Sequence, residues 1–199
     1  MTQAFVEGKR IPLTVLTVDP HTVINSKTVE KDGYTSVVLG IGTKKKDANN
    51  PLKKSLAKFG MVTNPKKIRE IRTEEVLEST SLVNLSEILV PGLTVSVTAI
   101  SKGKGTSGVM KRWGMHGGPR THGQSDRARH PGSIGRGTTP GRVLPGMHMA
   151  GNMGNTETCV RNLKIHSFDT ETGILKITGA ISGGRGALAK ITITKQPKS

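Results

Sequence analysis

The chain has 199 residues, with 30 lysines and arginines against 14 aspartates and glutamates, so its formal net charge at pH 7 is +16. Only 33% of the residues are hydrophobic and 3% aromatic, which is enough for a modest core but not for burial of the whole chain. We expect no membrane span and no secretory leader, and the single cysteine excludes an internal disulfide. This balance favours a nucleic-acid binder in a reducing compartment.

The first 43 residues predict short β-strands. A β-branched run over 11–19 follows a turn at Glu7-Gly8, and residues 22–28 and 34–41 are two further candidate strands. The sequence Lys31-Asp32-Gly33 between them is typical of a tight turn. We therefore expect a meander of short strands at the start of the chain.

One short helix is expected within an insertion at about 44–63. A run of lysines at 44–46 precedes Asn50 and Pro51, the pattern of a helix N-cap followed by proline at the first helical position. Apolar residues then recur at helical spacing, at Leu52, Leu56 and Phe59. Gly60 suits the left-handed position that ends a helix.

The rest of the chain outside residues 101–155 again favours β-structure. Residues 65–90 are rich in acids and fit either a helix or a strand with a loop; we expect them to face solvent or a basic protein neighbour. Residues 93–99 alternate between apolar and polar, the clearest strand pattern in the chain, and further strands follow at 160–168, 174–178 and 191–194. Many short strands with Gly/Pro turns favour a small antiparallel barrel or a sandwich.

Residues 101–155 have a different composition. They contain nine lysines and arginines against one acid, Asp126, together with fourteen of the 25 glycines and four of the six histidines. Such a segment cannot bury enough apolar surface to offset its ordering entropy, so we expect it to be ordered by a polyanionic partner. The alternative is a disordered basic linker. Arginine outnumbers lysine six to three and four prolines stiffen the segment, which favours a defined nucleic-acid contact.

Other chemistry is weakly supported in this stretch. Trp113 is expected on a short helix that begins at Thr106 or Ser107, where it either stacks on a base or anchors the root of the stretch to the β-domain. The anchoring role is the favoured one. The histidines lack the paired spacing of a zinc site, and neither a nucleophile elbow nor a Walker loop is present. We expect no metal, no cofactor and no enzymatic activity.

With these residues assembled, a resemblance to a known family emerges. The run from Gly103 to Asn155, together with the opening Met1-Thr2-Gln3-Ala4-Phe5 and residues 160–179, resembles the signature region of the universal ribosomal protein L-three family in its bacterial or organellar form. Members of that family usually begin with a short glycine- and lysine-bearing strand before the Met-Thr-Gln run. The resemblance therefore leads us to expect either a start upstream of Met1 or a missing barrel strand.

The resemblance implies a fold, a partner and a set of sites. The fold is a six-stranded antiparallel β-barrel of the translation-protein type, formed by residues 1–104 and 156–199, with a long irregular finger at 105–155 and one or two short helices. The stem of the finger would be Lys102–Trp113 and Arg142–Asn155, and its tip Pro131–Pro140, with Ser133, Ile134, Gly135, Arg136, Gly137, Thr138 and Thr139 foremost. The candidate rRNA-binding residues are Lys102, Lys104, Lys111, Arg112, Trp113, His116, Arg120, His122, Arg127, Arg129, His130, Arg136, Arg142, His148, Asn152 and Asn155.

The implied function is structural. The protein would bind the 3′ region of the large-subunit rRNA, nucleate subunit assembly, touch neighbouring ribosomal proteins and extend its finger toward the peptidyl-transferase centre. It would lie in a cytoplasmic ribosome, or in an organellar one, with no membrane and no small-molecule substrate. The rival hypotheses are a free-standing nucleic-acid chaperone or nucleoid-type binder and an RNA-modifying enzyme.

Overall fold

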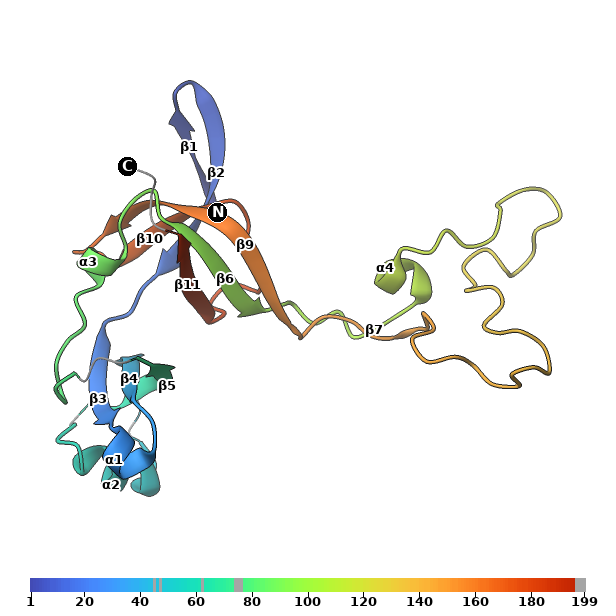
Figure 1. Ribbon diagram of the computed structural model, residues 1–199. Helices are drawn as coiled ribbons and strands as arrows, with labels where there is room; N and C mark the ends of the chain where they lie inside the picture. The colour runs from blue at the N-terminus through green and yellow to red at the C-terminus, as the bar shows by residue number, and fades with distance from the viewer. Residues whose placement is uncertain (45, 47, 62, 74–76, 196–199) are drawn as a thin grey trace. The chain divides into compact units, whose positions relative to one another are not determined.

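The computed structural model describes residues 1–44, 46, 48–61, 63–73 and 77–195. Within these residues the chain is mainly β, as expected, and its strands form three sheets (Figure 1). In order, the elements are β1 (Thr2–Val6), β2 (Lys9–Thr17), β3 (His21–Lys27), α1 (Val29–Asp32), β4 (Ser36–Thr43), α2 (Asn50–Ala57), β5 (Pro65–Arg72), α3 (Leu85–Ile88), β6 (Thr94–Ile100), β7 (Thr106–Ser107), α4 (Val109–Trp113), β8 (Gly151–Asn152), β9 (Glu157–Asp169), β10 (Ile174–Thr178) and β11 (Ala189–Lys195).

The largest sheet has six strands in the order β1-β2-β10-β9-β6-β11. Its first hairpin turns at Glu7 and Gly8, whose φ angles of 50° and 75° are those of the tight turns that match strand twist. No pairing among the described residues joins the edge strands β1 and β11, so the sheet is open in this part of the chain. The closed barrel therefore stays a prediction.

The apolar residues of this sheet are buried as the alternation predicts. In β6, Val95, Val97 and Ala99 are buried, whereas the polar residues between them are only partly covered. Leu175 and Ile177 of β10 are fully buried. The strand predictions at 93–99, 174–178 and 191–194 are confirmed, the first two nearly to the residue.

The three-stranded sheet, ordered β3-β4-β5, carries apolar clusters on its two faces. One cluster packs α2 against the sheet and contains Ile24, Leu56 and Met61, with Val38, Leu52 and Phe59 beside them. The other contains Val23, Val37 and Leu39, with Val83 packed against them. Residues 65–72, which the sequence left ambiguous, therefore form the strand β5.

Polar side chains link the three strands of this sheet. The Lys27 ammonium donates hydrogen bonds to the Tyr34 hydroxyl (2.6 Å) and to the Glu70 carboxylate (2.9 Å), and the Ser36 hydroxyl also donates to Glu70 (2.9 Å). Hydrogen bonds from Lys27, Tyr34 and Ser36 lower the pKa of Glu70 to about 2. Hydrogen bonds to Tyr34 and Glu70 raise the pKa of Lys27. The Glu70 carboxylate is therefore a charged link between β3, β4 and β5.

The helices differ in part from the expectation. The helix α2 begins at Asn50 with Asn49 as its N-cap, one residue earlier than predicted. Its end is confirmed: the N–H of Gly60 donates to Ala57 and that of Met61 to Leu56, and Gly60 has a φ of 71°, which is the Schellman arrangement. In the described residues there are four short helices rather than one or two, because residues 29–32 (α1) and 85–88 (α3) each also form one helical turn. Lys45, Glu74, Glu75, Val76 and the tail 196–199, which entered the predictions, lie outside the described residues.

The described chain divides into two compact units. One comprises the described residues of 1–95, 162–180 and 193–195 and contains the three-stranded sheet; the other comprises residues 96–161 and 181–192 and contains the finger. Among the described residues, no helix is both long and apolar enough to cross a membrane.

Candidate nucleic-acid interface

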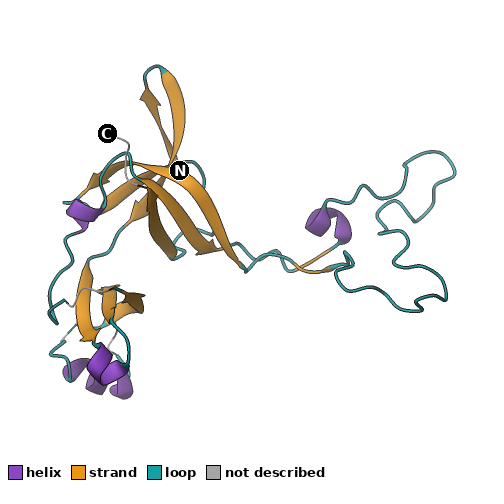
Figure 2. Ribbon diagram, in the orientation of Figure 1, coloured by secondary structure: helices purple, strands orange, loops and turns teal. Residues whose placement is uncertain are grey.

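The finger, residues 105–155, begins as an antiparallel ribbon. Backbone N–H groups of Ser101 and Lys104 donate to the carbonyls of Thr156 (2.9 Å) and Met153 (2.8 Å), and Met153 donates back to Gly105 (3.0 Å). The short strands β7 and β8 continue this pairing. Outside these strands and α4, the finger is loop (Figure 2). Its two ends are therefore held together by backbone hydrogen bonds, which a loose linker would lack.

A glycine allows the two chains of the ribbon to come this close. Gly154 has a φ of 76°, and a Cβ on it would collide with the carbonyl oxygen of Lys102 and lie 3.1 Å from the Cα of Gly103. Any other residue would be strained in this conformation and would also push the opposite chain away. The glycine content of the stretch thus has a structural role here, in addition to backbone access to a partner.

Side chains clamp the ribbon beyond β7 and β8. The helix α4 starts at Val109 after Gly108, not at Thr106 or Ser107 as expected, because Ser107 is paired in β7. The indole N–H of Trp113 and the guanidinium of Arg112 both donate to the Met149 carbonyl, at 2.9 and 3.0 Å. The indole also stacks on His148, with ring centroids 4.0 Å apart and planes 6° from parallel.

This clamp refines the anchoring role expected for Trp113. These contacts of its ring join the outgoing chain to the returning chain inside the finger, whereas the expectation was an anchor to the β-domain. Trp113 as a whole remains 44% exposed, and the Arg112 guanidinium carbon lies 5.0 Å from the centre of its ring. One part of the ring system therefore holds the finger together while another part faces outward.

Beyond the clamp, residues 117–130 form a closed loop, which we call the distal loop. The Gly118 N–H donates to the Ala128 carbonyl (3.1 Å) and closes the loop. Within the loop, the backbone N–H of Gln124 donates to the Thr121 carbonyl (3.1 Å). With its amide oxygen turned toward them, the Gln124 side chain accepts from the backbone N–H groups of Arg127 (3.3 Å) and Ala128 (3.2 Å). These bonds give the distal loop a shape of its own.

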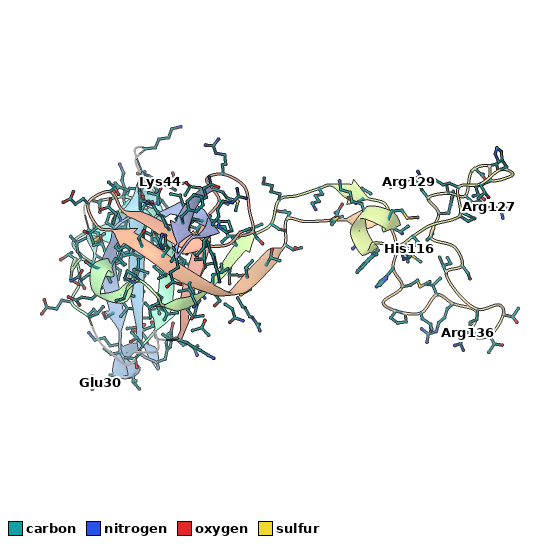
Figure 3. All side chains as sticks on the ribbon, turned by 90° about the horizontal axis from the view of Figure 1, so that it is seen from above. Glu30, Lys44, His116, Arg127, Arg129 and Arg136 are labelled. Carbon is teal, nitrogen blue, oxygen red and sulfur yellow. The ribbon has the colours of Figure 1, made fainter. Side chains whose placement is uncertain are left out.

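The predicted site residues are spread along the finger rather than gathered at one point. Arg127 and Arg129 lie on one lobe of the finger and Arg136 lies on the other (Figure 3). Of the sixteen candidates, all but the half-buried Arg112 are exposed. Every residue from 131 to 150, which includes the predicted tip, is also exposed.

The charge of the finger is not neutralised from within. The described ion pairs, Lys27–Glu70 and Lys66–Asp19, lie outside the finger, and none in the described chain involves a finger cation. Asp126, the single acid of the finger, accepts a hydrogen bond from the Ser125 hydroxyl at 3.1 Å. Exposed, unpaired arginines and lysines on a shaped but unburied backbone are suited to binding a chain of phosphates.

Some contributors were not predictable from side-chain chemistry. The Met149 carbonyl receives two donors, but a backbone acceptor leaves no mark in the sequence. The pair Gly117-Gly118 did carry a signal, because adjacent glycines in a cationic stretch suggest a close backbone approach. Within the described residues, no three His, Cys, Asp or Glu side chains gather in a way that could hold a metal ion.

Comparisons with known proteins agree on one family. The family model described as "Ribosomal protein L3" matches residues 37–181. Proteins named "Large ribosomal subunit protein uL3" from Dehalococcoides mccartyi (strain CBDB1) and Thermotoga maritima are each 41% identical to this chain; the first alignment covers 98% of the chain and 94% of the relative, the second 100% and 95%. The protein of the same name from Thermobifida fusca is 43% identical over 96% of the chain and 89% of the relative.

Proposed function

Because the chain belongs to the ribosomal protein L3 family, we propose that it is a structural constituent of the large ribosomal subunit whose finger binds large-subunit rRNA. The observation that carries this proposal is the finger itself, an arm held at both ends with exposed and unpaired cations along its length. Relatives that bear the name of a large-subunit protein support the ribosomal setting. Neighbouring ribosomal proteins are the other partners that this setting implies.

The finer parts of the proposal follow from the family resemblance. In this proposal, residues 1–104 and 156–199 form a β-barrel domain in which the six-stranded sheet closes on itself. The finger extends from this domain toward the peptidyl-transferase centre. The protein binds near the 3′ region of the rRNA and nucleates assembly of the subunit in the cytoplasm. It has a structural role in translation and performs no catalysis of its own.

The chemistry of the finger is consistent with this role. Arginine guanidinium groups form bidentate contacts with phosphate and fix orientation, while histidine and tryptophan rings offer stacking planes for unpaired bases. Ribbon pairing and the Trp113 clamp restrict the free finger, so less conformational entropy is lost when RNA orders it. The sixteen candidate residues are proposed to contact rRNA in this way.

Sedimentation tests the proposal. Tagged protein expressed in cells should move with large subunits through a high-salt gradient, because shape fit and base contacts within a folded subunit do not depend on counterion release, whereas binding through phosphate contacts alone weakens steeply with salt. A free-standing nucleic-acid chaperone would stay at the top of the gradient and bind unrelated RNAs equally well. That outcome would refute the ribosomal role.

A further inference from the structure

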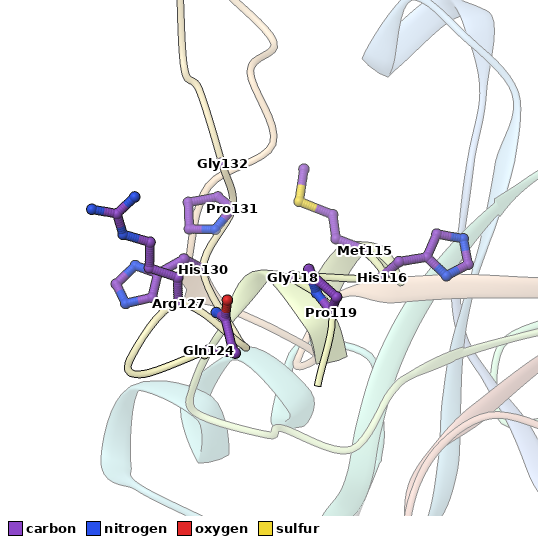
Figure 4. A pocket seen from close by; sticks show the side chains of 10 residues that line it. Met115, His116, Gly118, Pro119, Gln124, Arg127, His130, Pro131 and Gly132 are labelled. Carbon is purple, nitrogen blue, oxygen red and sulfur yellow. The ribbon is translucent and has the colours of Figure 1, made fainter. Parts of the chain in front are cut away.

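The distal loop and the segments on either side of it line an open pocket of about 570 Å³ (Figure 4). This volume lies within the ~300–1,000 Å³ range of small-ligand sites. We propose that this pocket binds one unpaired nucleobase of the RNA, so that the finger reads an extruded base in addition to neutralising phosphates. The inference rests on the proposed function and assigns a ligand to a part of the finger.

The walls of the pocket are flat or adaptable. Its lining includes Met115 and His116 on one side, Arg127, His130 and Pro131 on the other, and Pro119 between them. Imidazole and proline rings, a guanidinium plane and a thioether are surfaces on which a base can stack. A phosphate, by contrast, has no face to place against them.

Two of the three glycines that line the pocket, Gly117 and Gly118, allow the loop to close. A Cβ on Gly117 would collide with the Ala128 carbonyl and the Met110 side chain, and a Cβ on Gly118 would lie 2.9 Å from the Arg127 carbonyl. The loop therefore closes through the Gly118–Ala128 hydrogen bond only because side chains are absent there. The Gln124 side chain, whose amide oxygen accepts from Arg127 and Ala128, braces the adjoining turn. The part of the hollow that the distal loop forms is thus fixed by contacts within the loop.

Charge favours a nucleotide over other flat ligands. Arg127 lines the pocket, and Arg120 and Arg129 lie on the same loop, where they can hold the phosphates on either side of an extruded base. The nearby acid, Asp126, is not part of the lining. A base carried on a polyanionic backbone satisfies both the flat walls and the cationic rim.

The test compares two eight-nucleotide single-stranded RNAs with equal numbers of phosphates, one normal and one a stable abasic analogue, bound by the full-length protein. The wild-type protein should bind the normal RNA about tenfold more tightly, since base stacking adds to a shared phosphate contribution. His130→Ala and Met115→Ala, on opposite walls, should each lower this preference at least threefold. Thr121→Ala is the matched control, because Thr121 is an exposed residue of the same loop that neither lines the pocket nor belongs to the sixteen candidate rRNA-binding residues.

Equal wild-type affinities for the two RNAs would overturn the pocket assignment while leaving phosphate binding by the finger intact. A loss of preference in Thr121→Ala as large as that in His130→Ala would also overturn it. Failure to bind either RNA would instead count against the proposed function as a whole. A melting curve for each variant shows that the fold is retained.

Discussion

Trp113 and His148 lie with their rings 4.0 Å apart and nearly parallel, and they connect the outgoing chain of the finger to the returning one. The indole N–H strengthens the link through its 2.9 Å bond to Met149. Stacking and one hydrogen bond contribute on the order of 1 kcal/mol each. This stabilisation is small compared with the conformational entropy lost when a long loop is ordered. The clamp therefore reduces the number of conformations of the free finger without making it rigid.

Trp113→Ala should loosen the finger and leave the sheets intact. It removes the stack and the bond to Met149, whereas Trp113→Phe retains an aromatic face and loses only the N–H donor. We expect trypsin to cut the finger of the alanine variant severalfold faster than that of the wild type, with the phenylalanine variant between them. Unchanged cleavage in the alanine variant would show that the clamp does not order the finger.

Gly154→Ala should disrupt the ribbon more than Gly146→Ala. Both glycines have positive φ, 76° and 83°, so each substitution carries a similar backbone strain of roughly 1–2 kcal/mol. Only at Gly154 would the new Cβ also collide with the opposite chain, at the Lys102 carbonyl; at Gly146 no atom lies within 4 Å of it. Hydrogen exchange at the Lys104 and Met153 amides should therefore accelerate in the first variant alone. Equal acceleration in both would mean that strain, not contact, controls the ribbon.

Elements with a local cause were predictable from the sequence. Alternation placed β6 correctly, because burial on one face needs only a period of two, and Gly60 marked the end of α2, because its conformation disfavours other residues. Residues 29–32 instead form one helical turn. A single helical turn differs from a β-turn by little free energy, so the composition of these residues could not distinguish the two.

Features that depend on distant partners were not predictable. The clamp joins Trp113 to a carbonyl 36 residues away, and the acceptor is a backbone atom that any residue would provide. The distal pocket depends on the closure of a loop by Gly118 and Ala128, which sequence spacing does not report. The cations, in contrast, were evident from composition alone, because their role requires exposure and charge rather than a particular partner within the chain.

Protonation of Glu70 should destabilise the three-stranded sheet at low pH. The folded-state pKa of about 2 lies below the ordinary value of 4.5, so the carboxylate stabilises the fold above pH 4.5 and this contribution is lost as the pH falls from 4.5 toward 2. Glu70→Gln should lower the melting temperature at pH 7. Its stability should also fall less than that of the wild type between pH 4.5 and pH 2. For Lys27, whose pKa is raised, the contribution is present below its ordinary value of 10.5 and is lost only in strong alkali.

Glu30→Gln is the control for Glu70→Gln. Glu30 is an exposed carboxylate of α1, so its removal changes the net charge equally without breaking a link between strands. Melting curves between pH 2 and 7 should separate the two variants. Identical pH profiles would mean that general charge, rather than the contacts of Glu70 with Lys27 and Ser36, governs acid unfolding.

Replacing Arg127, Arg129 and Arg136 together by alanine should weaken RNA binding without destabilising the fold. All three side chains are exposed and form no ion pair among the described residues, so the melting temperature should not change. Each lost phosphate contact reduces the slope of log K against log salt by about 0.7–0.9, so three lost contacts should reduce it by about 2–3. The matched control replaces Arg10, Arg69 and Arg185, exposed arginines outside the finger, and should change the slope less. An equal change in both triple variants would assign binding to overall charge, and a fall in melting temperature of the finger variant would assign these arginines a structural role instead.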